Sequence, residues 1–245
     1  MKKHQVIIVL MALLLSTESL YAEPNPLSFN SAKKQLSKLY IDNQNSFYCG
    51  CEYRSVTKES GKGKKLAPDW SSCGFNPRKQ EKRASRIEWE HVMPAHHFGQ
   101  HMACWREGGR KACKKDPVFR AIEGDMHNLV PVIGEVNSDR SNFKFGMLEG
   151  ETRVYGQCDA EVNFKAKRFE PGPAVRGDIA RTYFYMSERY RIRLSKQQRA
   201  LFEAWNKADP VDQWEREKNH RVARIQGNLN PYIVNKEPRF YGLQK

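Results

Sequence analysis

After residue 15 the sequence has no apolar run of the roughly 20 residues that a transmembrane helix needs. It also lacks internal repeats and low-complexity linkers, so neither a solenoid nor a string of small domains is expected. Acidic residues are scarce beside basic ones, 28 against 42, and both signs are scattered along the chain. Apolar residues still make up 39% of the 245 positions, which argues against a disordered chain and a coiled coil. The composition therefore predicts one basic globular domain with a net charge of +14.

The excess of positive charge admits three kinds of partner. A basic surface raises the local concentration of polyanions, so nucleic acid, anionic membrane and acidic polysaccharide all fit. A basic isoelectric point kept only for solubility fits as well. Charge alone does not choose among these partners.

The first residues have the pattern of an export signal. Two lysines precede an apolar run over residues 6–15, and residues 16–22 are small and polar enough for a signal-peptidase site. The apolar run is too short to span a bilayer. We therefore expect residues 1–22 to be a signal peptide cleaved after Ala22. Residues 23–245 would then form a periplasmic or secreted domain that is not attached to the membrane.

Export makes a disulfide framework the first interpretation of the cysteines, because exported chains fold under oxidising conditions. The six cysteines are Cys49, Cys51, Cys73, Cys104, Cys113 and Cys158. Cys104 and Cys113 flank a tight turn at Gly108 and Gly109 and are expected to form a local pair.

The remaining four cysteines can pair in two ways, since Cys49 and Cys51 are too close to bond each other without strain. A hairpin centred on residues 61–65 would place Cys51 opposite Cys73. This favours Cys51 with Cys73 and Cys49 with Cys158.

Local patterns predict an α+β fold: a mixed α/β single domain with a helical C-terminal third. Two strands are expected, at residues 47–53, leading into the basic hairpin, and at residues 86–92. In the second strand Ile87, Trp89 and His91 share one face, and Glu88 and Glu90 share the other.

Helices are predicted from capping residues and apolar periodicity. They are expected at residues 28–39, 117–123, 133–142, 177–190, 195–207 and 210–226, with Pro131 separating the second from the third. Ser28, Ser195 and Asp209 are the expected N-caps, with Pro210 at the first helical position and Gly227 closing the last helix.

Candidate chemistry lies between residues 88 and 142. Glu90 and His91 are adjacent at a strand end and point to opposite faces, so one can hold a cation while the other handles a proton. A Glu-His dipeptide is common by chance, but segments 125–129 and 135–142 add many acids and amides beside apolar residues. Such clusters suit Mg2+, and Arg110 suits a phosphate because its guanidinium donates two parallel hydrogen bonds. Together these parts indicate metal-assisted phosphodiester hydrolysis.

A family resemblance is carried by eight strings, and the match runs over residues 47–232. They are RIEWEHVMPA, CWREGGRKAC, DMHNLVP, GEVNSDRSNF, YGQC, RTYFYM, LFEAWNK and QGNLNPY. In order and spacing they resemble the bacterial endonuclease I family of periplasmic and secreted nucleases. The resemblance implies a ββα-metal, His-Asn-His-like active-site motif, and cleavage of DNA, and of RNA as well, with little sequence preference.

The resemblance also assigns roles. His91 matches the family's general base, Glu90 and Asn137 match its metal ligands, and Arg110 matches its phosphate-contacting arginine. Glu123 corresponds to a further acid near the site. The implied cofactor is one Mg2+ ion, with Ca2+ or Mn2+ able to substitute, and the implied products carry 5′-phosphates. We expect a monomer. The residues predicted to contact nucleic acid are Arg110, Arg140, Lys62, Lys64, Lys65 and Arg83.

The chain departs from the family pattern in two places. Relatives commonly carry eight cysteines, but here Arg216 follows Trp214-Glu215 and the tail has no cysteine, which predicts one disulfide fewer. His96 and His97 stand where relatives usually have Trp-Gln.

Two alternatives compete with a nuclease. A zinc site could be built from His91, His96, His97, His101 and Cys104. We favour Mg2+, because Cys104 is expected in a disulfide and the oxygen pair of Glu90 and Asn137 suits the harder ion.

The other alternative is a secreted cationic binding module without catalysis. It would hold polyanions on Lys62, Lys64, Lys65, Arg78, Lys79, Lys82 and Arg83. It explains the charge, but not the occurrence of Glu90, Asn137 and Arg110 together with the family's strings.

Overall fold

A computed structural model describes residues 26–58, 60–150 and 152–234. The expected signal peptide, residues 1–22, lies outside the described residues. None of the helices in the described ranges combines the length and the apolar content that crossing a bilayer requires.

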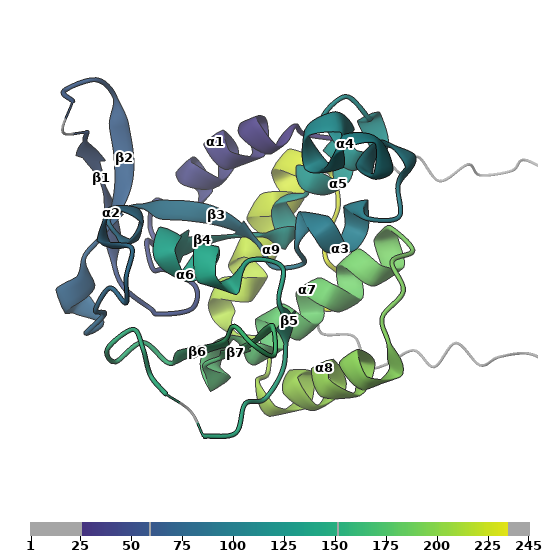
Figure 1. Ribbon diagram of the computed structural model, residues 1–245. Coiled ribbons are helices and arrows are strands. Elements are labelled where there is room, and N and C mark those ends of the chain that lie inside the picture. Colours follow the sequence, from purple (N-terminus) through teal and green to yellow (C-terminus); the bar gives the residue numbers. More distant parts are fainter. Residues whose placement is uncertain (1–25, 59, 151, 235–245) are drawn as a thin grey trace, which may run out of the picture.

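The fold combines small sheets with a larger helical part, as the α+β prediction requires (Figure 1). The strands are β1 (Tyr53–Thr57), β2 (Lys64–Pro68), β3 (Ile87–His91), β4 (Leu129–Ile133), β5 (Lys144–Phe145), β6 (Ala160–Asn163) and β7 (Arg168–Pro171). The α-helices are α1 (Phe29–Leu39), α2 (Glu81–Ala84), α3 (Ala95–Gly99), α4 (Ala103–Cys113), α5 (Pro117–Glu123), α6 (Gly134–Arg140), α7 (Arg176–Arg189), α8 (Lys196–Ala208) and α9 (Gln213–Gln226).

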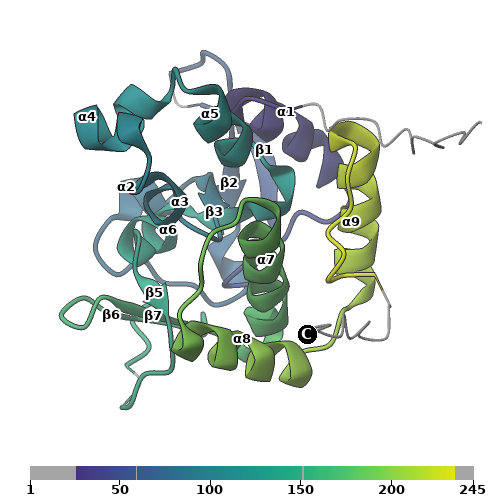
Figure 2. The ribbon, with the colours of Figure 1, turned by 90° about the vertical axis from the view of Figure 1, so that its right-hand side faces the viewer.

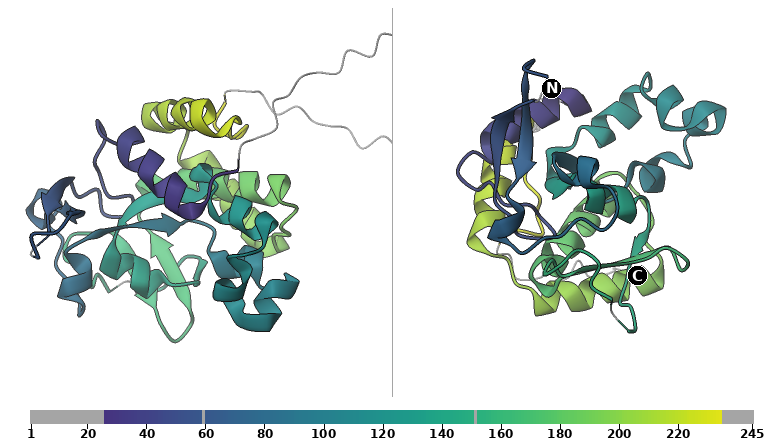
Figure 3. Two further views of the ribbon diagram at one scale, coloured as in Figure 1. Left: turned by 90° about the horizontal axis from the view of Figure 1, so that it is seen from above. Right: turned by 60° about the vertical axis from the view of Figure 1, so that its left-hand side comes forward.

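The antiparallel pair of β3 and β4 is the frame of the molecule. Glu90 lies opposite Val130, and His91 lies opposite Leu129. Helices α1 and α9 pack against each other on one side of this pair (Figure 3, left), where Trp89 joins their apolar cluster. Helix α6 contacts both strands and covers the side on which Glu88 and Glu90 lie. Both faces of β3 are therefore covered, which holds its side chains in place.

The main apolar core joins the β3–β4 pair to α7 and α8. Helix α7 runs through the middle of the molecule, with α8 across its end (Figure 2). Tyr183 and Phe202 pack with tilted rings, 4.5 Å apart between their centroids. The aromatic run of Tyr183, Phe184 and Tyr185 in α7 is buried and packs in this core.

All three predicted disulfides are present. They join Cys49 to Cys158, Cys51 to Cys73, and Cys104 to Cys113. The basic hairpin is confirmed as well, because β1 and β2 pair antiparallel with Thr57 opposite Lys64. The hairpin and α4 project from opposite sides of the molecule (Figure 3, right).

The strand predicted at residues 47–53 is wrong. This segment forms a tight turn in which the amide of Gly50 donates to the carbonyl of Ser46 at 2.8 Å, and the strand begins only at Tyr53. Gly50 adopts φ of 67°, a left-handed conformation that glycine enters readily and that interrupts an extended strand.

The region around Pro131 also differs from its prediction. It is a strand, β4, rather than a break between helices, and helix α6 begins after it at Gly134. All five residues of β4 are buried, and a proline is tolerated because β4 pairs with β3 alone. The sheet formed by β5, β7 and β6 was not predicted at all.

The predicted N-cap of the last helix is three residues too early. Asp212, not Asp209, caps α9, and Glu215 completes a capping box with it. The carboxylate of Asp209 instead accepts a hydrogen bond at 2.8 Å from the amide of Gly177, in the first turn of α7. The caps at Ser28 and Ser195 and the left-handed Gly227 are confirmed.

Candidate active site

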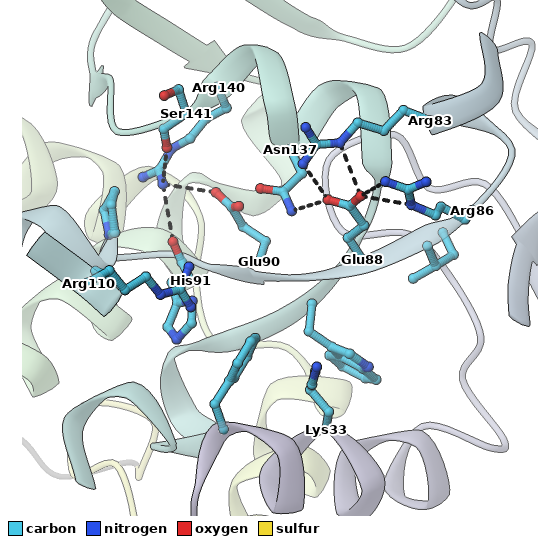
Figure 4. Close-up of a pocket in the computed structure, with 15 residues that line it drawn as sticks. Lys33, Arg83, Arg86, Glu88, Glu90, His91, Arg110, Asn137, Arg140 and Ser141 are labelled. Carbon is cyan, nitrogen blue, oxygen red and sulfur yellow. Dashed lines mark hydrogen bonds and ion pairs between the residues drawn. The ribbon is translucent and has the colours of Figure 1, made fainter. Parts of the chain in front are cut away.

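The candidate site is built around β3, whose side chains alternate between two faces as the sequence predicts. Glu88 and Glu90 point toward α6, and His91 lies on the side of α1 (Figure 4). The adjacent Glu90 and His91 are thereby separated by the strand itself. A cation site and a proton acceptor can sit next to each other without the two side chains competing.

His91 is held as a neutral base. Its Nε2 lies 2.8 Å from the carbonyl oxygen of Glu123, and a carbonyl only accepts, so Nε2 carries the proton and Nδ1 keeps its lone pair. Burial lowers the pKa of His91 to about 3, an effect that the hydrogen bond to Glu123 opposes only in part. The ring packs 4.7 Å from that of Phe29 in α1. A neutral imidazole with one free nitrogen is ready to accept a proton.

Glu90 is a buried carboxylate whose demand for donors is incompletely met. Nη1 of Arg140 lies 2.9 Å from Oε1 of Glu90, but the alignment is too poor for a hydrogen bond. Burial raises the pKa of Glu90 to about 7, although the charge of Arg140 acts in the opposite direction. Such a carboxylate is stabilised by a further positive charge.

Asn137 faces Glu90 from α6. Its Nδ2 donates to Oε2 of Glu88 at 2.9 Å, and Glu88 is itself held by Arg83 and Arg86. This orients the amide so that its oxygen points toward the carboxylate of Glu90 (Figure 4). Two oxygen acceptors turned toward each other repel unless a cation lies between them. The pair fits Mg2+, which takes few protein oxygens and keeps several waters.

Arg110 approaches the site from α4. Its Nε donates to Oε1 of Glu123 at 2.7 Å, and its side chain remains 43% exposed, so it can still meet a ligand. Gly109, just before it, adopts φ of 61° and ψ of −153°, a conformation essentially restricted to glycine. The sharp break in α4 at Gly109 therefore determines where Arg110 lies.

These side chains line one cavity of about 490 Å³. Phe29, Lys33 and Arg110 also line a neighbouring cavity of about 820 Å³ that reaches Lys111, Lys114 and Arg120. On the other side, Arg86 is shared with a cavity of about 860 Å³ beneath the hairpin, which is lined by Lys58, Lys65 and Lys82. The three cavities form one basic groove that runs from the hairpin past the site to α4 and α5. This groove suits a polyanionic chain.

Comparisons with known proteins identify the family. The endonuclease I family model matches residues 28–237. A periplasmic deoxyribonuclease of Aeromonas hydrophila is 53% identical over 208 residues, covering 84% of this chain and 85% of the relative. The protein named endonuclease-1 from Buchnera aphidicola subsp. Acyrthosiphon pisum is 46% identical over 206 residues, covering 84% of this chain and 80% of the relative.

The chain belongs to the endonuclease I family. It is therefore a nuclease, and the predicted resemblance is confirmed. An extracellular ribonuclease of Bacillus subtilis is also similar, at 34% identity over 132 residues, but it covers only 46% of this chain and 44% of the relative.

The structure of this endonuclease I relative brings most of the predicted site residues together. Glu90, His91, Arg110 and Asn137 line the same cavity, and Arg83 lies at its wall. Glu123 lies behind Arg110 and lines the adjacent part of the groove.

Of the three hairpin lysines predicted to contact nucleic acid, one lines the groove and two do not. Lys65 lines the groove beneath the hairpin, whereas Lys62 and Lys64 lie on the hairpin, exposed and outside its lining.

Arg140 differs from its prediction as a nucleic-acid contact. Its side chain is 0% exposed, and its guanidinium donates to the carbonyls of His91 at 3.1 Å and Val92 at 2.6 Å besides facing Glu90. A basic residue beside a predicted active site suggested a phosphate contact, but no local pattern shows that its partner is a carboxylate on a strand 50 positions earlier. The structure gives it the role of positioning Glu90 and the end of β3.

Sequence reasoning gave no role to Glu88, Phe29 and Lys33, which also line the cavity. Glu88 orients Asn137, and Phe29 and Lys33 complete the wall from α1. The strand alternation placed Glu88 beside Glu90 and could have suggested its part. The spacing of Phe29 and Lys33 puts them on one helical face, but nothing local indicates that this helix reaches β3.

The alternative zinc site lacks its cysteine ligand, because Cys104 is bonded to Cys113. No group of three metal-ligating His, Cys, Asp or Glu side chains gathers anywhere in the described ranges. His97 is occupied by the carbonyl oxygen of Asn142 at 3.0 Å.

Proposed function

We propose that the protein is an exported, Mg2+-dependent endonuclease that hydrolyses phosphodiester bonds of DNA without sequence preference and leaves 5′-phosphates. The observation that carries the proposal is the neutral His91 beside the facing oxygens of Glu90 and Asn137. Export is supported by the names of relatives, which include periplasmic and extracellular deoxyribonucleases. RNA is a second substrate in this proposal, supported by the partial match to a ribonuclease.

The proposed reaction is an in-line hydrolysis. Nδ1 of His91 takes a proton from a water molecule as its oxygen bonds to phosphorus and the bond from phosphorus to O3′ breaks. O3′ takes a proton from solvent, which leaves a 3′-hydroxyl and a 5′-phosphate. Arg110 donates to the non-bridging phosphate oxygens, and Glu123 positions both this guanidinium and the ring of His91.

The metal ligands in this proposal are Glu90 and Asn137. A divalent cation held there supplies positive charge to the phosphate and to the leaving oxygen. Arg140 and Glu88 position these two ligands, as their contacts with Glu90 and Asn137 indicate. Ca2+ or Mn2+ would use the same oxygens.

Plasmid nicking tests the function and the metal together. We expect nicking in Mg2+, loss of it in EDTA, and recovery when Mg2+ is returned in excess. Glu90→Gln should require more Mg2+ for half-maximal activity, because it removes the charge of one ligand while keeping its shape. Undiminished nicking in EDTA would contradict the metal proposal. The absence of nicking with every cation would contradict the nuclease and favour the cationic binding module.

Binding to the basic groove should depend steeply on salt. For duplex DNA each phosphate contact contributes about 0.9 to the slope of log affinity against log salt. The double substitution of Lys111→Ser and Lys114→Ser should therefore reduce the slope by about 1.8. Fluorescence anisotropy in EDTA, repeated at several salt concentrations, measures this slope.

The matched control removes two charges elsewhere, at the exposed Lys165 and Lys207, which line none of the three groove cavities. An equal change of slope in the Lys165→Ser and Lys207→Ser variant would show that total charge, not the groove, sets binding. Random duplexes of equal length should bind alike, because the proposed contacts involve phosphates rather than base edges.

A further inference from the structure

A separate cavity lies on the other side of α3 from the active site. It has a volume of about 630 Å³ and is lined by residues of α3, β5, α7, the connection from α7 to α8, and the start of α8. Figure 1 shows where these elements lie. It shares no lining residue with the cavities of the groove. Met93, His97 and Phe98 face it, whereas Pro94 and Ala95 face the active site. We name it the α3–α8 cavity.

The charge of the α3–α8 cavity is entirely positive. Lys144, Arg191 and Arg193 line it together with two histidines, and none of the acidic residues that the structure describes does. By contrast, carboxylates line the active-site cavity and both of its neighbours. Arg191 and Arg193 are exposed. Repulsion among three cations without a carboxylate in the same wall favours an anionic ligand.

Arg191 occupies a position where folding favours glycine. Its φ is 53°, in the left-handed region just after α7, where glycine commonly ends a helix without strain. The amide of Ile192 donates to the carbonyl of Ser187 at 3.0 Å, and the hydroxyl of Ser187 donates back to Ile192 at 2.7 Å. These bonds hold the connection in this shape. An arginine kept here at a conformational cost indicates a use for its side chain.

The cavity also has an aromatic wall that is held rigidly. The hydroxyl of Tyr190 donates to Asp125 at 2.6 Å, and the guanidinium of Arg189 lies 5.6 Å from its ring centroid. Ile192 and Leu194 are half-buried in the same wall. A fixed tyrosine ring beside arginines is the combination on which unpaired bases stack while their phosphates meet positive charge. The volume is that of a small-ligand site, too small for a duplex.

We propose that the α3–α8 cavity binds an unpaired nucleotide of a nucleic-acid strand, with the phosphate on Arg191, Arg193 and Lys144 and the base against Tyr190. The choice of nucleic acid over other polyanions rests on the proposed function. The segment at residues 93–98 lines both cavities from its two sides, and a helix with its side chains is about 10–12 Å across. A single-stranded end can therefore extend from the groove into this cavity, whereas a blunt duplex cannot enter it.

Two binding probes test the proposal: a single-stranded oligothymidylate and a blunt hairpin duplex. Both are measured by anisotropy in EDTA, and their integrity is checked on a gel. The Arg191→Gly and Arg193→Ser variant should bind the single strand about tenfold more weakly, with a salt slope lower by about 0.7, since both arginines are proposed to hold one phosphate and a single-strand phosphate contributes about 0.7. Duplex binding and plasmid nicking should change less than about twofold. Thermal stability should not fall, because glycine suits position 191.

Tyr190 supplies a second test. Tyr190→Leu should weaken single-strand binding about tenfold by removing the stacking surface, whereas Tyr190→Phe keeps the ring and loses only its hydrogen bond to Asp125, so it should weaken binding much less. The variant lacking the charges of Lys165 and Lys207 is the control for total charge.

The proposal would be overturned if the cavity variants weakened duplex binding as much as single-strand binding. It would also be overturned if the Lys165→Ser and Lys207→Ser control weakened single-strand binding as much as they do. Loss of nicking would not overturn it, because binding and cleavage are measured separately; selective single-strand binding without nicking would contradict only the proposed function.

Discussion

The His91→Ala variant is expected to lower turnover by about 10² to 10⁴-fold while DNA affinity stays nearly unchanged. The reason is that Nδ1 of His91 is the free nitrogen of a ring whose Nε2 is already engaged by Glu123. The groove that binds the substrate keeps its charges in this variant. The measurements are single-turnover cleavage in Mg2+ and anisotropy with duplex DNA in EDTA.

A control variant and a chemical rescue distinguish the role of His91 as a base from its role in packing. His220→Ala removes an exposed histidine of α9 and should leave turnover unchanged. His91 packs against Phe29 and Phe98, so its removal opens space in the wall of the cavity. Added imidazole should then restore part of the activity by accepting the proton there. Near wild-type cleavage by His91→Ala would exclude His91 as the base.

Local chemistry accounts for the parts of the fold that could be predicted. The alternation along β3 placed Glu90 and His91 on opposite faces, and hydroxyl caps marked the starts of α1 and α8. The disulfide pairing also followed from local features, because the hairpin brings Cys51 and Cys73 together and leaves Cys49 for Cys158. Each of these inferences depends on residues close together in the chain, except the pairing of Cys49 with Cys158, which followed by elimination.

The features that could not be predicted depend on contacts between distant segments. Strand β4 is a short buried run containing Pro131, which local patterns assign to a break, and only its pairing with β3 makes it a strand. Asp209 has the residue type of an N-cap, yet its carboxylate accepts from the amide of Gly177 in the first turn of α7 rather than from the helix that follows it.

Contacts between distant segments also explain what could not be predicted about the candidate site. Glu90 and His91 were singled out by the strand pattern and Asn137 by the family resemblance, but Arg140 was predicted to contact nucleic acid. Its burial against Glu90 becomes visible only when α6 is packed over β3. The part played by α1 likewise depends on how that helix lies against the strand.

Reduction of the disulfides is expected to abolish most of the activity. The three bonds join cysteines that are 109, 22 and 9 positions apart in the sequence. The chain entropy that each bond removes from the unfolded state then contributes about 4.8, 3.4 and 2.6 kcal/mol to the free energy of unfolding. Their sum is comparable with the whole stability of a typical domain, about 5–15 kcal/mol. Millimolar dithiothreitol should inactivate the protein, and reoxidation should restore it. Activity measured beside free-thiol titration tests this, and full activity with six free thiols would contradict it.

Two paired substitutions should separate stability from catalysis. Cys49→Ser with Cys158→Ser removes the longest loop closure and should lower Tm by about 10–20 °C, from its loss of about 5 kcal/mol. Cys104→Ser with Cys113→Ser should lower Tm least. It should nevertheless reduce turnover at low temperature, because this disulfide closes the segment that carries Gly109 and Arg110. If both pairs reduced turnover only in proportion to unfolded protein, the Cys104–Cys113 bond would have no part in positioning Arg110. The loss of stability without disulfides would benefit a producing cell. A chain still reduced in its cytoplasm would be too unstable to cleave the cell's own DNA.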